Sequence, residues 1–222
     1  MLKNIIDLFV FLTKQIIYDM EGELMMRDHI GVIHGRFQML HIGHMEYLLA
    51  GKERCEYLII GISNPDISLT KYSGANPHRS TSLANPLTYY ERFQMITKAM
   101  IESGVNQSDF DIVPFPINYP ELLFNYVPLN AKFYMTIYDD WSKEKQLSLQ
   151  KLGCDIDIMW TRTNEEKATS GTEVRNLIAN AKPWSHLVPK SVFEYVTENE
   201  IDKRIINMST LEDKNNATNC QC

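Results

Sequence analysis

The 222-residue sequence has little of what several protein classes require. It holds 4 cysteines, two of them in the last three residues, so neither a disulfide framework nor a paired-cysteine zinc site is indicated. Basic residues number 22 against 28 acidic ones, which argues against a protein that coats long nucleic acid. The sequence contains no apolar run long enough to span a bilayer, and it has neither a Gly-Lys-Ser/Thr nor a Gly-x-Gly-x-x-Gly motif. What remains is the composition of a globular protein, large enough to bury roughly 70% of its unfolded surface.

The sequence divides into three parts. Residues 1–28 form an apolar extension with Ile, Leu and Phe at helical spacing, so we expect a helix that docks on its own domain or on a partner subunit. Charged and polar residues interrupt the extension, which makes a membrane-surface helix the less favoured alternative. Residues 29–206 carry the periodic pattern of one domain, and residues 207–222 are polar and are expected to be disordered. No secretory signal is recognised, so we expect a cytoplasmic protein.

Apolar stretches of strand length alternate with helical patterns in the central part. The strands are apolar on both faces, as in a parallel sheet that is covered on both sides. We therefore predict an α/β fold, a Rossmann-like doubly wound parallel sheet of about five strands with C-terminal helices. Residues 63–85 are polar and are expected to form a long loop. The expected strands are 29–34, 57–62, 110–115, 132–137 and 156–160, and the expected helices are 43–54, 88–103, 120–126, 140–152, 171–180 and 189–206.

The loop after the first strand has the residues that a phosphate site needs. Gly35 lets backbone N–H groups approach a ligand, and Gly43 opens a helix whose N-terminus favours an anion. His41 and His44 are three residues apart, so both imidazoles can face the same ligand. Two alternatives are less favoured: histidines with a purely structural role, and a zinc site that adds His34 but lacks carboxylate or thiol ligands at useful spacing.

A second candidate anion site opens a later helix. Ser170 or Thr172 can cap this helix, and Arg175 adds a planar cation suited to phosphate oxygens one turn further on. Taken alone, the pattern is better explained by an ordinary N-cap followed by a surface arginine. Taken with the first site, it fits a polyphosphate held across the carboxyl end of the sheet.

Both segments carry a family resemblance. Residues 35–44, Gly-Arg-Phe-Gln-Met-Leu-His-Ile-Gly-His, resemble the first motif of the nucleotidyltransferase superfamily of the HxGH type, with Met in place of its usual Pro. Residues 170–175 are similar to its second motif, Ser-x-Thr-x-x-Arg. Over about residues 30–200, the branch that the chain most resembles is the archaeal-type nicotinamide-nucleotide adenylyltransferases. The resemblance implies that an ionised phosphate of an acceptor attacks the α-phosphorus of a nucleoside triphosphate and that pyrophosphate leaves.

The resemblance also implies roles for particular residues. The triphosphate would be accompanied by Mg²⁺, for which the sequence shows no metal site of its own. The acceptor side would include Asn85, Thr88, Arg92 and Phe124. The catalytic residues implied are His41, His44 and Arg175, which also bind the nucleotide together with Gly35, Arg36, Phe37, Ser170 and Thr172.

The acceptor is the part for which the sequence departs from the family. In the loop 116–124, the Asp, Asn and Trp with which the family receives the nicotinamide nucleotide are missing or displaced, although Phe124 can supply an aromatic ring. The turn 137–141 also differs. The long loop adds His78 and Arg79, which either reach a substrate phosphate or belong to a solvated loop. The favoured function is transfer of AMP from ATP to nicotinamide mononucleotide, giving NAD. The alternatives are transfer to phosphopantetheine, a phospho-alcohol or a phospho-sugar with CTP as a further donor, and a non-catalytic nucleotide-binding regulator. The expected partners are small nucleotides and, by family habit, a second copy of the chain, with neither nucleic acid nor membrane.

Overall fold

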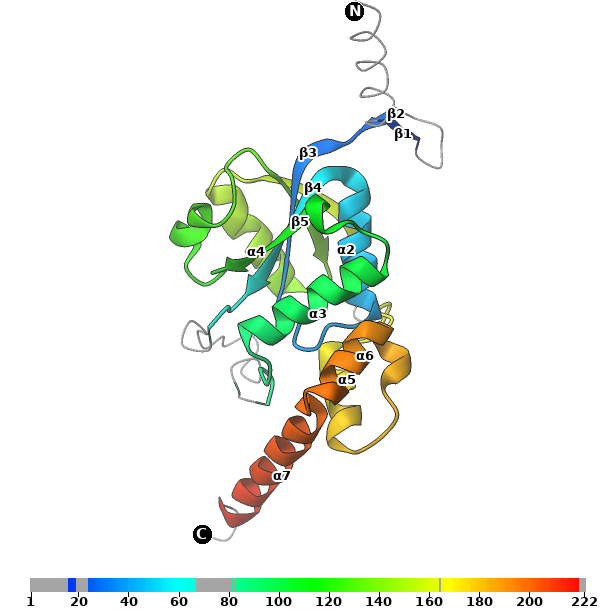
Figure 1. Ribbon diagram of the computed structural model, residues 1–222. Helices are drawn as coiled ribbons and strands as arrows, with labels where there is room; N and C mark the ends of the chain where they lie inside the picture. Colours follow the sequence, from blue (N-terminus) through cyan, green and yellow to red (C-terminus); the bar gives the residue numbers. More distant parts are fainter. Residues whose placement is uncertain (1–15, 19–23, 67–80, 82, 164, 220–222) are drawn as a thin grey trace, which may run out of the picture.

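The computed structural model describes residues 16–18, 24–66, 81, 83–163 and 165–219 (Figure 1). Its centre is a sheet of five parallel strands in the order β5-β4-β3-β6-β7, which confirms the predicted α/β fold. The helices expected from the sequence are present, with the segment 120–126 as a short 3-10 helix. The strands are β3 (Asp28–Gly35), β4 (Cys55–Ser63), β5 (Phe110–Phe115), β6 (Lys132–Ile137) and β7 (Asp155–Thr161). The helices are α2 (Ile42–Arg54), α3 (Tyr89–Glu102), η3 (Gln107–Asp109), η4 (Pro120–Asn125), α4 (Asp140–Lys151), α5 (Gly171–Ala179), η5 (Ser185–Leu187), α6 (Lys190–Glu198) and α7 (Ile201–Asn219).

Each face of the sheet packs against its own apolar layer. Ile33 of β3 belongs to the cluster formed with α2, α3 and the C-terminal helices. Its neighbour Val32 points the opposite way, into a second cluster with η4 and α4. Figure 1 shows α2 and α3 on one side of the strands and α4 on the other. Burial on both faces explains why the central strands β3 and β4 have continuous apolar runs, at residues 30–33 and 57–62.

The strand order places a ligand site at one edge of the sheet. The chain moves outward from β3 to β4 and β5, then crosses back to add β6 and β7 on the other side of β3. The direction of winding therefore reverses between β3 and β6. In open parallel sheets, a crevice forms outside the carboxyl ends of the two strands where this reversal occurs.

The N-terminal extension differs from the expected helix where it is described. β1 (Ile16–Tyr18) and β2 (Leu24–Met26) pair as an antiparallel hairpin directly before β3. The helix prediction is therefore wrong for residues 16–18, because pairing with β2 satisfies the backbone there. Its main part, residues 1–15, lies outside the described residues, as does most of the long loop with His78 and Arg79.

The C-terminal end also differs from the expectation. Residues 189–206 form two helices instead of one, since the chain turns at Glu200, whose φ is +54°. α7 then continues to Asn219, so the prediction of disorder from residue 207 is wrong for the backbone of residues 207–219. Ile201 and Ile205 are buried in the core and begin this helix, and no Gly or Pro follows to end it. In Figure 1, α7 extends away from the sheet, at the opposite end of the molecule from the β1–β2 hairpin.

Candidate active site

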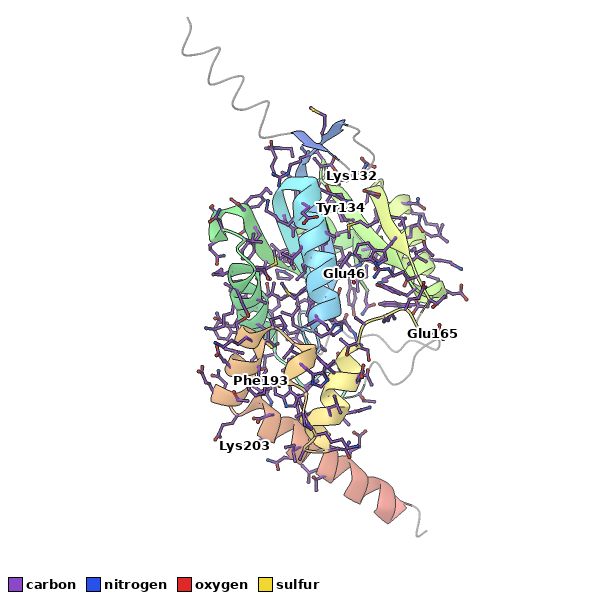
Figure 2. The ribbon with its side chains drawn as sticks, turned by 90° about the vertical axis from the view of Figure 1, so that its right-hand side faces the viewer. Glu46, Lys132, Tyr134, Glu165, Phe193 and Lys203 are labelled. Atoms are coloured by element: carbon purple, nitrogen blue, oxygen red, sulfur yellow. The ribbon has the colours of Figure 1, made fainter. Side chains whose placement is uncertain are left out.

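A cavity of about 650 Å³ opens at the carboxyl ends of β3 and β6. Its walls come from the loop after β3, the beginning of α2, the turn after β6, the first half of α4 and the beginning of α5. In Figure 2, Glu46 of α2 lies at the level of this edge, while Lys132, at the start of β6, lies towards the opposite end of the sheet. The predicted residues that the structure brings into the cavity are Gly35, Arg36, Phe37, His41, His44, Ser170, Thr172 and Arg175.

The two histidines of the first motif form one unit at the beginning of α2. His41 is the N-cap residue of the helix, and its Nδ1 accepts a hydrogen bond of 3.3 Å from the backbone N–H of His44. The two imidazole rings stack with centroids 3.7 Å apart. In addition, Nδ1 of His44 is buried and has no hydrogen-bond partner in the part of the chain that the structure describes. Both rings therefore lie beside the free N–H groups of a helix N-terminus, where an anion is favoured.

Both imidazoles are neutral at pH 7. Burial lowers the pKa of His41 to about 4, and the nearby cations Lys167 and Arg175 act in the same direction. Burial also lowers the pKa of His44 well below its usual range, with further lowering by His41 and Arg36. A neutral imidazole carries one N–H donor and one acceptor, so each ring can donate one hydrogen bond to a ligand oxygen.

The second motif is joined to the first by a buried arginine. Ser170 caps α5 by accepting a hydrogen bond of 3.1 Å from the backbone N–H of Glu173. Of the two capping residues expected from the sequence, Ser170 and Thr172, the structure thus has Ser170. Arg175 is only 6% exposed. Its guanidinium donates to the main-chain carbonyl of Gln38 and, at 3.1 Å, to the hydroxyl of Thr172. Burial lowers the pKa of Arg175 to about 10, which leaves it charged at neutral pH.

Gly171 allows this close approach of the two motifs. A Cβ at this position would lie 2.6 Å from the carbonyl oxygen of Gln38 and 2.8 Å from the backbone nitrogen of Met39. Both neighbours are backbone atoms, which cannot rotate away as a side chain can. The beginning of α5 therefore packs directly on the loop of the first motif only because residue 171 has no side chain.

The cavity is cationic although the chain carries a net charge of −6. The described residues of its lining include five cations and two carboxylates. One of these carboxylates, Glu46, binds the guanidinium of Arg162 through hydrogen bonds of 2.8 and 3.1 Å. Aromatic rings hold three of the cations by cation–π contacts: Lys145 over Trp141, Lys167 over Tyr138 and Arg162 over Trp160. The five cations are Arg36, Lys145, Arg162, Lys167 and Arg175. A polyanion can therefore bind to a protein that is acidic as a whole.

Residues 32–177 match the model of the cytidylyltransferase-like family. The chain belongs to this family. A phosphonoformate cytidylyltransferase from Streptomyces viridochromogenes is 48% identical over 79% of this chain and 94% of its own length. A nicotinamide-nucleotide adenylyltransferase from Thermococcus sibiricus is 30% identical over 83% of this chain and 92% of its own length. The chain is accordingly a nucleotidyltransferase, as the two motifs predicted.

Solved structures support the fold of this nucleotidyltransferase. A bifunctional NMN adenylyltransferase/ADP ribose pyrophosphatase from Francisella tularensis superposes with a TM-score of 0.63 at 16% identity. The match covers 88% of this chain and 57% of that longer protein. No helix in the described part of the chain is long and apolar enough to cross a membrane.

The four residues expected on the acceptor side lie outside the cavity lining of this nucleotidyltransferase. Thr88 caps α3 in a capping box with Glu91, and Phe124 packs into the apolar cluster on the α4 face. Asn85 accepts a hydrogen bond of 3.4 Å from Arg36. Arg92 is 2% exposed and donates to main-chain carbonyls, among them those of residues 36, 63 and 64. These side chains shape the loops around the site, and their contact with an acceptor remains a prediction.

The cavity lining also holds residues that were not predicted as part of the site from the sequence, among them Lys145, Arg162, Lys167 and His34. The sequence pattern indicates His34 only as a zinc ligand, yet it is 7% exposed at the end of β3 and faces the cavity. The available signal was a histidine that follows the apolar run 30–33 and directly precedes the first motif. Among the described residues, no group of three or more His, Cys, Asp or Glu side chains is arranged to hold a metal ion, so the zinc alternative finds no support there.

Proposed function

We propose that this nucleotidyltransferase transfers CMP from CTP to a small phosphonate, with phosphonoformate as the first acceptor to test. The observation that carries the proposal is the 48% identity to a phosphonoformate cytidylyltransferase over 94% of that protein. The nicotinamide-nucleotide adenylyltransferases cover a similar span at 28–30% identity. The proposal replaces the donor and acceptor that the sequence motifs alone favoured.

The chemistry of such a transfer suits a site without a strong base. An ionised phosphonate oxygen of the acceptor attacks the α-phosphorus of CTP and forms a new P–O bond. The bond between the α-phosphorus and its bridging oxygen breaks, and pyrophosphate leaves with the electron pair. The nucleophile is already deprotonated at neutral pH, so the protein has to align the two anions and stabilise the charge that develops on the leaving group.

The residues of the two motifs are suited to these tasks. His41 and His44 lie at the N-terminus of α2, so their N–H groups and the helix backbone can donate to the triphosphate. Arg175, at the edge of the same cavity, provides the buried cation for the departing phosphates. His41, His44 and Arg175 are thus the proposed catalytic residues.

Magnesium enters the proposal as part of the nucleotide substrate. Mg²⁺ commonly binds through substrate phosphates and keeps several waters, so it does not require a carboxylate cage from the protein. The described lining of the cavity has two carboxylates, and Glu46 is engaged by Arg162, so the donor set does not fit a resident metal site of the protein. No step above depends on a protein-held metal.

The charge of the cavity favours a compact, highly charged acceptor. Phosphonoformate carries a carboxylate directly on its phosphonate group, so its negative charges lie close together. Lys145, Arg162 and Lys167 line the cavity in addition to the residues of the two motifs, and they provide charge for such an acceptor. A nicotinamide ring instead requires an aromatic platform with amide partners. Residues 116–124 after β5 hold neither Asp nor Trp, and their Asn118 donates a hydrogen bond of 3.1 Å to Asn64.

Transfer of AMP from ATP to nicotinamide mononucleotide is the second candidate. It is favoured by the 30% identity to the Thermococcus sibiricus enzyme, in a match that covers 92% of that enzyme. The two candidates use the same motifs and differ in base and acceptor. A substrate screen therefore separates them.

The test is pyrophosphate release by the purified chain with magnesium and each of four nucleoside triphosphates. The acceptors are phosphonoformate, nicotinamide mononucleotide, nicotinate mononucleotide and phosphopantetheine. We expect the highest kcat/KM for CTP with phosphonoformate, and no release when the acceptor is omitted. A higher kcat/KM for ATP with nicotinamide mononucleotide overturns the proposal. A His44→Asn variant with unchanged circular dichroism should show no turnover, which excludes a contaminating activity.

A further inference from the structure

His34 occupies an unusual position at the end of β3. It follows Val32 in the strand alternation, so its side chain points to the sheet face that α4 and η4 cover. His41 and His44 stand instead at the beginning of α2, the helix that packs on the other face. Since His34 also lines the cavity, it borders the same space as the triphosphate motifs from the opposite side of the sheet.

The ring of His34 is held in a fixed plane by stacking. It lies on the ring of Phe115, with centroids 4.5 Å apart and planes 4° from parallel. The two residues belong to β3 and β5, which are separated by β4. Gly61 of β4 is paired with His34, and a Cβ there would lie 2.4 Å from the Phe115 ring. The missing side chain at Gly61 thus lets Phe115 reach across β4 to His34.

Both ring nitrogens of His34 are buried, and neither has a hydrogen-bond partner among the described residues. Burial lowers the pKa of His34 well below its usual range, and Lys145 lowers it further, so the ring is neutral and carries one N–H donor. A buried donor or acceptor without a partner lowers the stability of the folded chain. A bound ligand oxygen at the N–H would recover part of that cost.

Two neighbours indicate which substrate this oxygen belongs to. Lys145 of α4 lines the cavity on the same face and acts electrostatically on His34. Phe115, on which His34 stacks, is the last residue of β5 and leads directly into the loop 116–119. The triphosphate motifs occupy the other wall, so the His34 wall is left for the acceptor. A neutral N–H beside an ammonium group matches an acid oxygen better than a base or a sugar ring.

We propose that His34 is a specificity-determining residue for the acceptor, and that its N–H donates a hydrogen bond to the carboxylate of a small phosphonate beside Lys145. This assignment rests on the proposed cytidylyl transfer and names the group of the acceptor that the protein recognises. The hydrogen bond orients the acceptor with its phosphonate towards the α-phosphorus of CTP. It does not require His34 to gain or lose a proton.

The test compares His34→Leu with the wild-type chain. Leu removes both nitrogens at similar volume, so we expect the KM for phosphonoformate to rise about 10- to 100-fold, the loss of one hydrogen bond to a charged group. The KM for CTP should stay within about twofold, because a hydrogen bond to the acceptor does not contribute to nucleotide binding. The midpoint of thermal unfolding should stay equal or rise, since an unpartnered buried polar group is removed. A purely structural histidine would instead lower this midpoint and leave both KM values unchanged.

Thr97→Val is the matched control. The hydroxyl of Thr97 in α3 is also buried without a partner, but it lies outside the cavity lining. Its removal should raise the unfolding midpoint in the same way and change neither KM value. A Lys145→Met variant should also bind phosphonoformate more weakly and leave the affinity for CTP unchanged.

Binding is measured as well as turnover, so that the two proposals fail in different ways. Phosphonoformate should raise the unfolding midpoint of the wild-type chain in the presence of CMP and should do so much less for His34→Leu. If the wild-type chain binds phosphonoformate through His34 but does not turn over CTP and phosphonoformate, the proposed function is overturned and the assignment of His34 is not. Equal stabilisation of the two chains, or no stabilisation of either, overturns the assignment of His34. A rise in the KM for CTP instead of the acceptor KM also overturns it.

Discussion

The guanidinium of Arg175 in α5 donates a hydrogen bond to the main-chain carbonyl of Gln38, in the loop that follows β3. This bond joins the second sequence motif to the first, although the two are 137 residues apart. The side chain of Gln38 in turn exchanges two hydrogen bonds of 2.9 Å with the backbone of Leu87. The segment before α3, the loop of the first motif and the beginning of α5 therefore form one connected wall of the cavity.

Replacing Arg175 by Lys should impair both the wall and the chemistry. Lys retains the positive charge, but it has no planar fork with which to hold Gln38 and Thr172 and still reach a phosphate. We expect kcat/KM to fall about 100-fold and the free energy of unfolding to fall by about 1–3 kcal/mol. Steady-state pyrophosphate release and urea unfolding measure the two effects.

Arg204→Lys is the control for this change. Arg204 binds the carboxylate of Glu91 and the carbonyl of Pro86 from α7, outside the cavity lining. The Arg204→Lys variant should lose about as much stability as Arg175→Lys, but its kcat/KM should not fall. If Arg175→Lys loses only stability, Arg175 does not act on the substrate.

Gly171→Ala should displace the beginning of α5 from the loop of the first motif. The added Cβ meets backbone atoms of Gln38 and Met39 at 2.6 and 2.8 Å, so the helix has to move. We expect a loss of about 1–3 kcal/mol in the free energy of unfolding and a higher KM for the nucleotide. Gly104→Ala provides the contrast, because Gly104 has a φ of +85° and nothing within 4 Å of its Cβ position. It should cost stability through backbone strain and leave the KM unchanged.

Short-range signals in the sequence predicted the fold and most of the cavity. Each strand and helix in the central part is defined by local periodicity and by breakers such as Pro86 or Gly153, so their positions agree with the structure within a few residues. The two motifs lie directly after β3 and at the beginning of α5, where the parallel topology brings them together. The one helix expected over residues 189–206 is divided at Glu200, which no local signal marks.

What could not be predicted depends on contacts between distant segments. The family resemblance alone implies the four acceptor-side residues Asn85, Thr88, Arg92 and Phe124, and the structure surrounds Arg92 with backbone carbonyls. His34 became a candidate only when its stacking on Phe115 and its unpartnered nitrogens were known. Similarly, α7 extends through a polar segment because buried Ile201 and Ile205 anchor its first turns.

Gly61→Ala tests the contact that holds His34. The new Cβ would lie 2.4 Å from the Phe115 ring, so the ring has to shift and the stack on His34 is lost. We expect a destabilisation of about 1–3 kcal/mol together with a higher acceptor KM. Gly31→Ala is crowded in the same way, by Tyr134 at 2.4 Å and Cys55 at 2.7 Å, but at the amino end of the sheet. Only the Gly61 variant should change the acceptor KM; an equal change in both would show that the effect is general loss of stability.

The stability of the chain should fall as the pH drops below 6.5, in part because of His41. Its pKa is about 4 in the folded chain and near 6.5 when unfolded, so between these values the unfolded state binds a proton that the folded state does not. Protonation therefore favours unfolding, and at pH 5 this group should account for a loss of about 2 kcal/mol relative to pH 7. Asn at position 41 can still cap α2, so His41→Asn should lose less stability than wild type over the same interval. His41 adds to the effect of burial in lowering the pKa of His44, so His41→Asn should also make the pKa of His44 less depressed. Both changes reduce the loss of stability as the pH falls.

Urea unfolding of both chains at several values between pH 7 and pH 4 measures this difference. His186→Asn serves as the control because His186 is exposed. The stability of this variant should change with pH as that of the wild type does. Equal slopes for His41→Asn and wild type would show that His41 is not held neutral by burial. Nucleotide binding should act in the opposite sense on the same group: a triphosphate beside His41 favours the protonated ring. Its binding at pH 6 should therefore be accompanied by proton uptake, measured as a dependence of the calorimetric enthalpy on the buffer, and His41→Asn should reduce that uptake.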